Sequence, residues 1–194
     1  MQHLTRDDLF TLEKYAEVRP EFRAQVMAHK KNRKLHLGDH ATLYFEDRMT
    51  IQYQVQEMLR VERIFEAAGI EEELQTYNPL IPDGSNWKAT FMLEYEDVEE
   101  RQLALAKLIG IEEQVWVRVA GFDKVNPIAN EDLERSTAEK TSSVHFLRFE
   151  LSADMVAALK SGAALAMGSD HENYRVEVDP LDQAVRDALV ADLD

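Results

Sequence analysis

Glu57 and Arg60 are the first residues in the chain whose types and spacing suggest chemistry. They lie three residues apart in a segment where apolar residues such as Ile51, Val55 and Leu59 occupy most of a helical circumference. A charge buried on such a helix must be paired, because an unpaired buried charge costs free energy. Two interpretations stay open. Glu57 either forms an ion pair that fixes packing, with Arg60 or with another helix, or is a carboxylate of raised pKa that serves as a metal ligand or general base.

His145 and Arg148 lie in the segment T-S-S-V-H-F-L-R-F, which has the alternation of a strand. Alternation places His145 on the same face as Leu147 and Phe149, and Arg148 on the opposite face. If the first face belongs to the core, His145 is either a buried imidazole satisfied by hydrogen bonds or a ligand or acid–base group. Arg148 either pairs with a carboxylate on a helix or orients an anionic substrate.

His171 and Tyr174 lie in a second polar segment, G-S-D-H-E-N-Y-R, which joins two expected strands. The sequence predicts a hairpin loop here, and loops often display functional residues. The strand phase places His171 on the same apolar side as His145. One short helix separates their strands, so we expect these strands to be neighbours or next-neighbours in one sheet. If Glu57 lies near both imidazoles, His145, His171 and Glu57 form a three-ligand site suited to iron, manganese or zinc.

Several absences narrow the function. The chain contains no Cys, which excludes thiolate nucleophiles and any Cys-ligated cluster held by this chain alone. It has no Gly-rich phosphate loop, no G-x-S-x-G elbow and no H-E-x-x-H motif. Its 22 basic and 37 acidic residues give a net charge of −15, which opposes nucleic-acid binding. No signal peptide and no membrane-spanning segment is expected, so the sequence predicts a cytoplasmic protein.

The elements that must position these residues begin with helices. Pro20 suits the first turn of a second helix, and a long third helix is expected from about Arg48 to Ala68. Asp47 is the expected N-cap of that long helix, and Gly69 its C-cap.

Strands dominate the second part of the chain, where a strand–helix–strand pattern occurs twice. The expected strands cover residues 87–95, 115–119, 144–151, 163–169 and 174–178, and a last helix follows Pro180. The polar stretch Asn126–Ser142 is expected to be a mobile loop. The pattern predicts an α+β fold, in which N-terminal helices pack on a mainly antiparallel or mixed sheet built from the two units. Residues 1–194 are expected to form a single domain, with a helical portion (1–78) and a sheet-rich portion (86–194).

Three stretches of the chain together resemble a known family. They are R-P-E-F-R-A-Q-V-M near Pro20, the run from Phe45 that begins F-E-D-R-M-T-I-Q-Y-Q-V, and the two segments that hold His145 and His171. Over nearly its whole length the chain is similar to an uncharacterised bacterial family described only as a domain of unknown function. In that family the genes often neighbour those of a rubrerythrin-like protein and an iron–sulfur oxidoreductase of the heterodisulfide-reductase type. The resemblance implies an association with peroxide or oxygen defence, or with an electron-transfer module.

Two classes of function follow. The first is a small redox protein that binds a metal or a small anionic ligand through His145, His171, Glu57 and Tyr174, with Arg60 or Arg148 orienting the anion. The second is a non-catalytic accessory subunit that docks on a redox partner, for which the resemblance implies a rubrerythrin-like protein or an iron–sulfur oxidoreductase. Neither class involves nucleic acid or a membrane.

Overall fold

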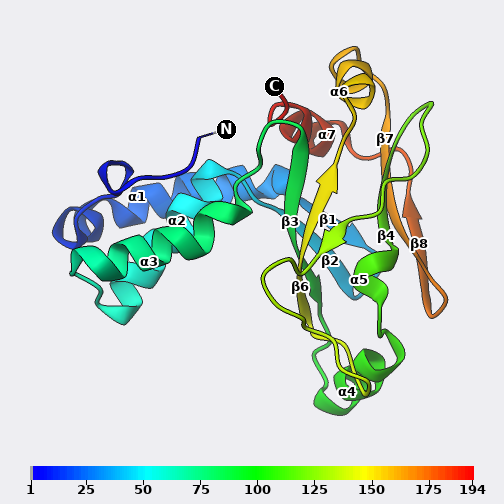
Figure 1. Cartoon of the computed structure of the whole chain (residues 1–194), viewed down its shortest axis with the longest axis horizontal. Coiled ribbons are helices and arrows are strands. Elements are labelled where there is room, and N and C mark those ends of the chain that lie inside the picture. Colours follow the sequence, from blue (N-terminus) through cyan, green and yellow to red (C-terminus); the bar gives the residue numbers. More distant parts are fainter. Residues whose placement is uncertain (1) are drawn as a thin grey trace.

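The computed structural model describes residues 2–194 and shows a helical portion beside two antiparallel sheets (Figure 1). The helical portion holds α1 (Leu12–Lys30), α2 (Arg48–Glu62) and α3 (Ala67–Tyr77), which lie side by side. Three short 3₁₀ helices flank them: η1 (Arg6–Asp8) precedes α1, η2 (Lys31–Arg33) follows α1, and η3 (Asn78–Leu80) follows α3. Among residues 2–194, no helix is both long and apolar enough to span a membrane.

Helix α1 runs through Pro20, where the sequence predicted the start of a new helix. Thr11 caps α1, since its side chain accepts a hydrogen bond from the backbone nitrogen of Lys14. Proline removes one hydrogen bond from a helix interior. The rings of Tyr15 and Phe22, which lie before and after Pro20 in α1, contact each other edge to face with their centroids 6.4 Å apart.

The prediction of one long helix over residues 48–68 is wrong, because α2 ends at Glu62. Asp47 caps its start as expected, but Arg63 adopts a left-handed conformation (φ 55°) and turns the chain into α3. Gly69 is therefore not a C-cap and lies inside α3. A Cβ added at Gly69 would lie 2.7 Å from Cγ2 of Ile64, so Gly69 permits the close approach of the turn to α3.

Two separate sheets replace the one sheet that the pattern suggested. The larger sheet has the order β1-β2-β3-β6-β5, and the smaller one has the order β4-β7-β8; all neighbours in both are antiparallel. The strands are β1 (Lys34–Leu37), β2 (Ala41–Phe45), β3 (Asn86–Leu93), β4 (Val115–Val119), β5 (Ile128–Ala129), β6 (Val144–Glu150), β7 (Leu165–His171) and β8 (Tyr174–Val178).

Each strand–helix–strand unit begins in the larger sheet and ends in the smaller one. The first unit runs from β3 through α4 (Val98–Lys107) and α5 (Ile111–Gln114) to β4. The second runs from β6 through α6 (Ala153–Lys160) to β7, and α7 (Gln183–Val190) follows β8. The predicted α+β class and antiparallel pairing are confirmed, but the strands that carry His145 and His171 belong to different sheets.

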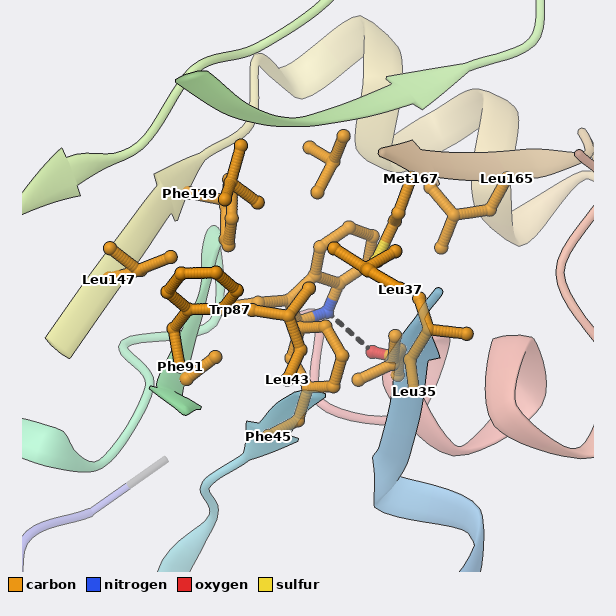
Figure 2. Packing of buried hydrophobic residues seen from close by; sticks show 14 of the residues in the cluster. Leu35, Leu37, Leu43, Phe45, Trp87, Phe91, Leu147, Phe149, Leu165 and Met167 are labelled. Atoms are coloured by element: carbon orange, nitrogen blue, oxygen red, sulfur yellow. Dashed lines mark hydrogen bonds between the residues drawn. The ribbon is translucent and has the colours of Figure 1, made fainter. Parts of the chain in front are cut away.

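The main hydrophobic core lies between the two sheets (Figure 2). Trp87 and Phe149 of the larger sheet pack toward Leu165 and Met167 of the smaller one, and the indole nitrogen of Trp87 donates to the backbone oxygen of Leu189, 2.8 Å away. The helical portion has a smaller core of its own. Its buried members are Leu4, Ile51, Val55, Leu59, Leu74 and Ile81.

Buried Arg33 joins the helical portion to the C-terminal end of the chain. Its guanidinium pairs with Asp192 and lies 3.4 Å from a carboxylate oxygen of Asp47. It also donates to the backbone oxygens of Phe45 and Glu46, each 3.2 Å away. This network fixes the end of α1, the start of α2 and the C-terminal segment relative to one another, because a buried guanidinium needs all of these partners.

Candidate functional site

A cleft of about 490 Å³ lies between α3 with η3 and the outer face of the larger sheet. We call it the interlayer cleft. It is lined by Gln75, Thr76, Tyr77, Pro79, Leu80, Lys88, Ala89, Glu131, Asp132, Arg135, Phe146, Leu147 and Arg148. A second cavity of about 240 Å³ adjoins it, since Tyr77, Leu80 and Phe146 line both, and Lys30 and Glu46 lie in that second cavity.

Strand alternation places the charged residues of the sheet in the cleft. Along β3 and β6 the core-facing residues are buried, and the residues between them point outward. Lys88 of β3 pairs across the sheet with Arg148 of β6, and Thr90 pairs with Phe146. The alternation of the two strands therefore places the basic side chains of Lys88 and Arg148, and the ring of Phe146, on the surface that lines the cleft.

Arg148 forms an ion pair with the carboxylate of Glu131 at the wall of the cleft. Its Nε donates to Oε2 of Glu131 at 2.8 Å, and its Nη2 donates to Oε1 at 2.7 Å, a bidentate pair. Its Nη1 donates to Glu150, two residues further along the same strand. The Arg148 guanidinium lowers the pKa of Glu131 below its ordinary value, so this carboxylate is ionised at neutral pH.

Two other cations line the cleft. The guanidinium of Arg135 stacks 4.5 Å from the ring centroid of Phe146 and donates to Asp132 at 2.5 and 2.6 Å. The ammonium of Lys88 donates to the backbone oxygens of Pro79 and Ile81 at 2.8 and 2.9 Å. Three cationic side chains and two carboxylates thus surround an apolar floor in a protein whose net charge is −15.

Glu57 does not line the cleft and belongs to an ion pair between two helices. Its carboxylate accepts from Arg19 of α1 at 2.7 and 2.8 Å, from the Tyr15 hydroxyl at 2.7 Å, and from Arg60 at 3.2 Å. The Arg19 hydrogen bonds lower the pKa of Glu57 to about 2. The structure therefore supports the ion-pair interpretation of Glu57 and Arg60, and the lowered pKa of Glu57 is opposite to the raised pKa of the alternative interpretation.

His145 is fully buried behind the cleft and is held neutral. The side-chain oxygen of Asn130 accepts from the backbone nitrogen of Phe146 (3.2 Å), which turns the amide nitrogen of Asn130 toward Nδ1 of His145 (3.0 Å). Nδ1 is therefore an acceptor, and Nε2 carries the proton and donates to the backbone oxygen of Ser142 at 3.0 Å. Burial lowers the pKa of His145 below its ordinary value, although the carboxylate of Glu112 lies 3.8 Å away.

His171 and Tyr174 lie at the other sheet. His171 ends strand β7 and is buried, where the sequence predicted an exposed loop; its Nε2 lies 3.2 Å from the backbone oxygen of Ile109. The Tyr174 hydroxyl donates to the backbone oxygen of Leu37 (2.7 Å) and accepts from the backbone nitrogen of His40 (3.0 Å), which ties β8 to the β1–β2 hairpin.

The structure does not bring the expected metal ligands together. His145 lies in the larger sheet, His171 in the smaller sheet and Glu57 in α2. Within residues 2–194, no group of three or more His, Cys, Asp or Glu side chains is placed to hold a metal ion. Strand phase predicted the buried face of His145 correctly, but a shared phase cannot bring two residues together when their strands belong to different sheets.

Of the six sequence-derived candidates, Arg148 alone is among the residues that line the cleft, and its partners were missed. Glu131, Asp132 and Arg135 lie in the stretch that the sequence assigned to a loop, where no periodicity marks them. The position of Lys88 could have been predicted in part. It lies in an alternating strand, and it points to the same face as Arg148 if the two strands are paired. That pairing joins residues 60 positions apart, and the sequence does not reveal it.

The fold and the site together define an α+β protein of two packed sheets, with a charged cleft beneath a helical layer. The chain matches the family described as "Protein of unknown function (DUF3501)" over residues 3–193, and it belongs to that family. It is similar to a crystal structure described as a novel protein of unknown function from Burkholderia pseudomallei K96243. The two chains share 53% identity over 100% of each, with a TM-score of 0.94. No match was found among curated proteins.

Proposed function

We propose that this protein binds a small organic anion in the interlayer cleft, with the anionic group at Arg148 and the apolar part on Phe146 and Leu80. The main observation behind the proposal is that Arg148 binds the carboxylate of Glu131 in a bidentate manner at the wall of a cavity of about 490 Å³. The proposal keeps one sequence-based expectation, an anion oriented by Arg148, and assigns no ligand role to His145, His171 or Glu57.

The size and lining of the cleft support this function. Small-molecule sites are concave, enclose ~300–1,000 Å³, and combine apolar walls with a few polar groups that fix orientation. Here Tyr77, Pro79, Leu80 and Phe146 supply the apolar surface, and Arg148 supplies a planar donor edge that matches a carboxylate.

The distribution of charge supports an anionic ligand. A chain with a net charge of −15 repels anions over most of its surface. Within the cleft, Lys88, Arg135 and Arg148 are three cationic side chains, each of which is paired with a carboxylate. Lys30 in the adjoining cavity has no ion-pair partner among the described residues. An anion that reaches the cleft therefore meets a local cluster of cationic side chains, where it can bind by replacing one of the carboxylates.

Calorimetric titration with benzoate and succinate, and with the neutral benzamide and succinamide, tests the proposal. We expect the carboxylates to bind and the amides not to bind, and we expect Arg148→Gln to weaken binding at least tenfold. Arg19→Gln is the matched control, because it removes a second bidentate Arg–Glu pair whose residues do not line the cleft. Absence of carboxylate binding to the parent protein, or equal binding to Arg148→Gln, contradicts the proposal.

A second function, docking on a redox partner as an accessory subunit, is favoured by one surface feature. Val61 and Phe65 near the turn between α2 and α3 expose 59% and 66% of their surface, unusual for apolar side chains so close together. We propose the rubrerythrin-like protein or the iron–sulfur oxidoreductase implied by the family resemblance as the partner. Co-purification with either protein should be lost in Val61→Ser/Phe65→Ser and kept in Val98→Ser, which changes another exposed apolar residue.

A further inference from the structure

We infer that Glu131 is an internal competitor, whose carboxylate occupies the place of the ligand's anionic group at Arg148 and leaves when the ligand binds. This inference rests on the proposed anion site and names how that site is regulated. It makes Glu131 an affinity-determining residue, because an incoming carboxylate must first replace it.

The planar edge of Arg148 that best fits a carboxylate is already occupied. One edge, formed by Nε and Nη2, is filled by both oxygens of Glu131, and Nη1 donates to Glu150. A carboxylate ligand that binds through Nε and Nη2 must therefore replace Glu131. Binding is therefore an exchange of one carboxylate for another.

Glu131 is the partner that can leave. Glu150 lies on β6 itself, where its backbone is paired with Asn86 of β3, so its position relative to Arg148 is fixed by the sheet. Glu131 follows the two-residue strand β5 in an irregular segment, and 51% of its side chain is exposed. A change of side-chain rotamer moves its carboxylate into water without breaking a strand.

The residue before Glu131 holds the segment in place when the carboxylate moves. Asn130 has a left-handed backbone (φ 53°), and its backbone nitrogen donates to the backbone oxygen of Phe146 at 2.8 Å. Its side chain bonds Nδ1 of buried His145 and the backbone nitrogen of Phe146. Further along, the Ser136 hydroxyl donates to buried Glu112 at 2.5 Å. These inner contacts anchor the segment on both sides of Glu131, so the exchange at Arg148 is local.

Two measurements on Glu131→Gln test the inference. Glutamine keeps the size of the side chain but removes the charge that competes. We expect benzoate and succinate to bind Glu131→Gln at least threefold more tightly than the parent. Glu177→Gln is the matched control, because it removes an exposed carboxylate that pairs with Arg118 and does not line the cleft; its affinity should stay within twofold of the parent.

The second measurement needs no ligand. Phenylglyoxal modifies accessible arginines, and mass spectrometry of peptides reports the rate at Arg148. We expect this rate to rise at least threefold in Glu131→Gln and to stay unchanged in Glu177→Gln. An unchanged rate at Arg148 in Glu131→Gln overturns the inference whether or not any carboxylate binds.

The outcomes separate the inference from the proposed function. Equal carboxylate affinity of the parent and Glu131→Gln, with binding lost in Arg148→Gln, overturns the competitor and leaves the anion site standing. Weaker binding to Glu131→Gln also overturns it, since Glu131 would then help to hold the ligand. A faster reaction at Arg148 without carboxylate binding to any variant supports the shielding of Arg148 by Glu131 and refutes the anion site.

Discussion

Two bidentate arginine–glutamate pairs in this protein have nearly the same geometry and different surroundings. Arg19 grips Glu57 at 2.7 and 2.8 Å, and Arg148 grips Glu131 at 2.8 and 2.7 Å. In the first pair both residues lie on helices, α1 and α2, that pack against each other, and Tyr15 donates a further hydrogen bond. In the second pair one residue lies on a strand and the other on an irregular segment beside a cavity.

The difference shows that contact geometry alone does not determine what an ion pair does. The side chain of Glu57 is 19% exposed, whereas that of Glu131 is 51% exposed. Removing the helical carboxylate leaves a guanidinium and a hydroxyl without their partner between two packed helices. Removing the cleft carboxylate frees a guanidinium that faces water and a cavity. The first pair stabilises packing, and the second can be exchanged.

The largest effect is expected at the buried anchor of the segment that carries Glu131. His145→Leu leaves Asn130, Thr141 and the backbone oxygen of Ser142 without their partner, so the free energy of unfolding should fall by about 3 kcal/mol. Urea denaturation measures this loss. The same substitution at exposed His36 is the control and should change stability by less than ~0.5 kcal/mol. Equal losses in the two variants would show that the His145 contacts do not anchor the segment.

The helical pair should contribute more stability than its counterpart in the cleft. Glu57→Gln should lower the free energy of unfolding by about 1 kcal/mol, because its partner Arg19 remains 32% exposed and water screens the pair. Arg19→Gln should shift stability in the same direction, and the double variant should lose less than the sum of the two single losses. Additive losses would mean that the two residues stabilise the fold independently.

The stability that Glu57 supplies should depend on pH in a definite direction. The pKa of Glu57 is about 2 in the folded protein, against an ordinary value of 4.5. A carboxyl whose folded pKa is lowered stabilises the fold above its unfolded pKa, and the contribution is lost as pH falls toward the folded value. The parent and Glu57→Gln should therefore differ at pH 7 and converge between pH 4.5 and 2. A difference that persists at the acid end would assign the effect to packing.

The smallest effect on stability is expected in the cleft. Glu131→Gln should change the free energy of unfolding by less than ~0.5 kcal/mol, because a pair with an exposed carboxylate contributes little. Measured beside Glu57→Gln in the same urea series, this variant separates a pair that holds the fold from one that is free to exchange. A loss as large as that of Glu57→Gln would make the two pairs equivalent and remove the contrast.

Local patterns predicted several parts of the candidate site correctly. Alternation in the segment around His145 placed its imidazole and Arg148 on opposite faces of the strand, and the structure shows that the His145 face is the buried one. Asp47 caps α2 as predicted, because an N-cap depends on neighbours within a few residues. The prediction of one long helix was wrong at Arg63, which adopts a left-handed backbone conformation although it is not a glycine, the residue that usually marks such a helix end. There the chain turns so that Ile64 and Ile70 of the next segment pack on the same small core as Leu59.

Sequence alone indicated the α+β class from the order of its helical and strand patterns, and alternation within one segment placed Arg148 on the strand face opposite His145. Tertiary structure decided which strands share a sheet, and so separated His145 from His171. It also paired Lys88 with Arg148 across β3 and β6 and brought Glu131 to the same guanidinium. The physical reason is that a strand's pattern specifies which face is buried but not which strand lies beside it. The long-range packing of the two sheets determines which strands are neighbours, and the pairing of β3 with β6 in turn forms the lining of the cleft.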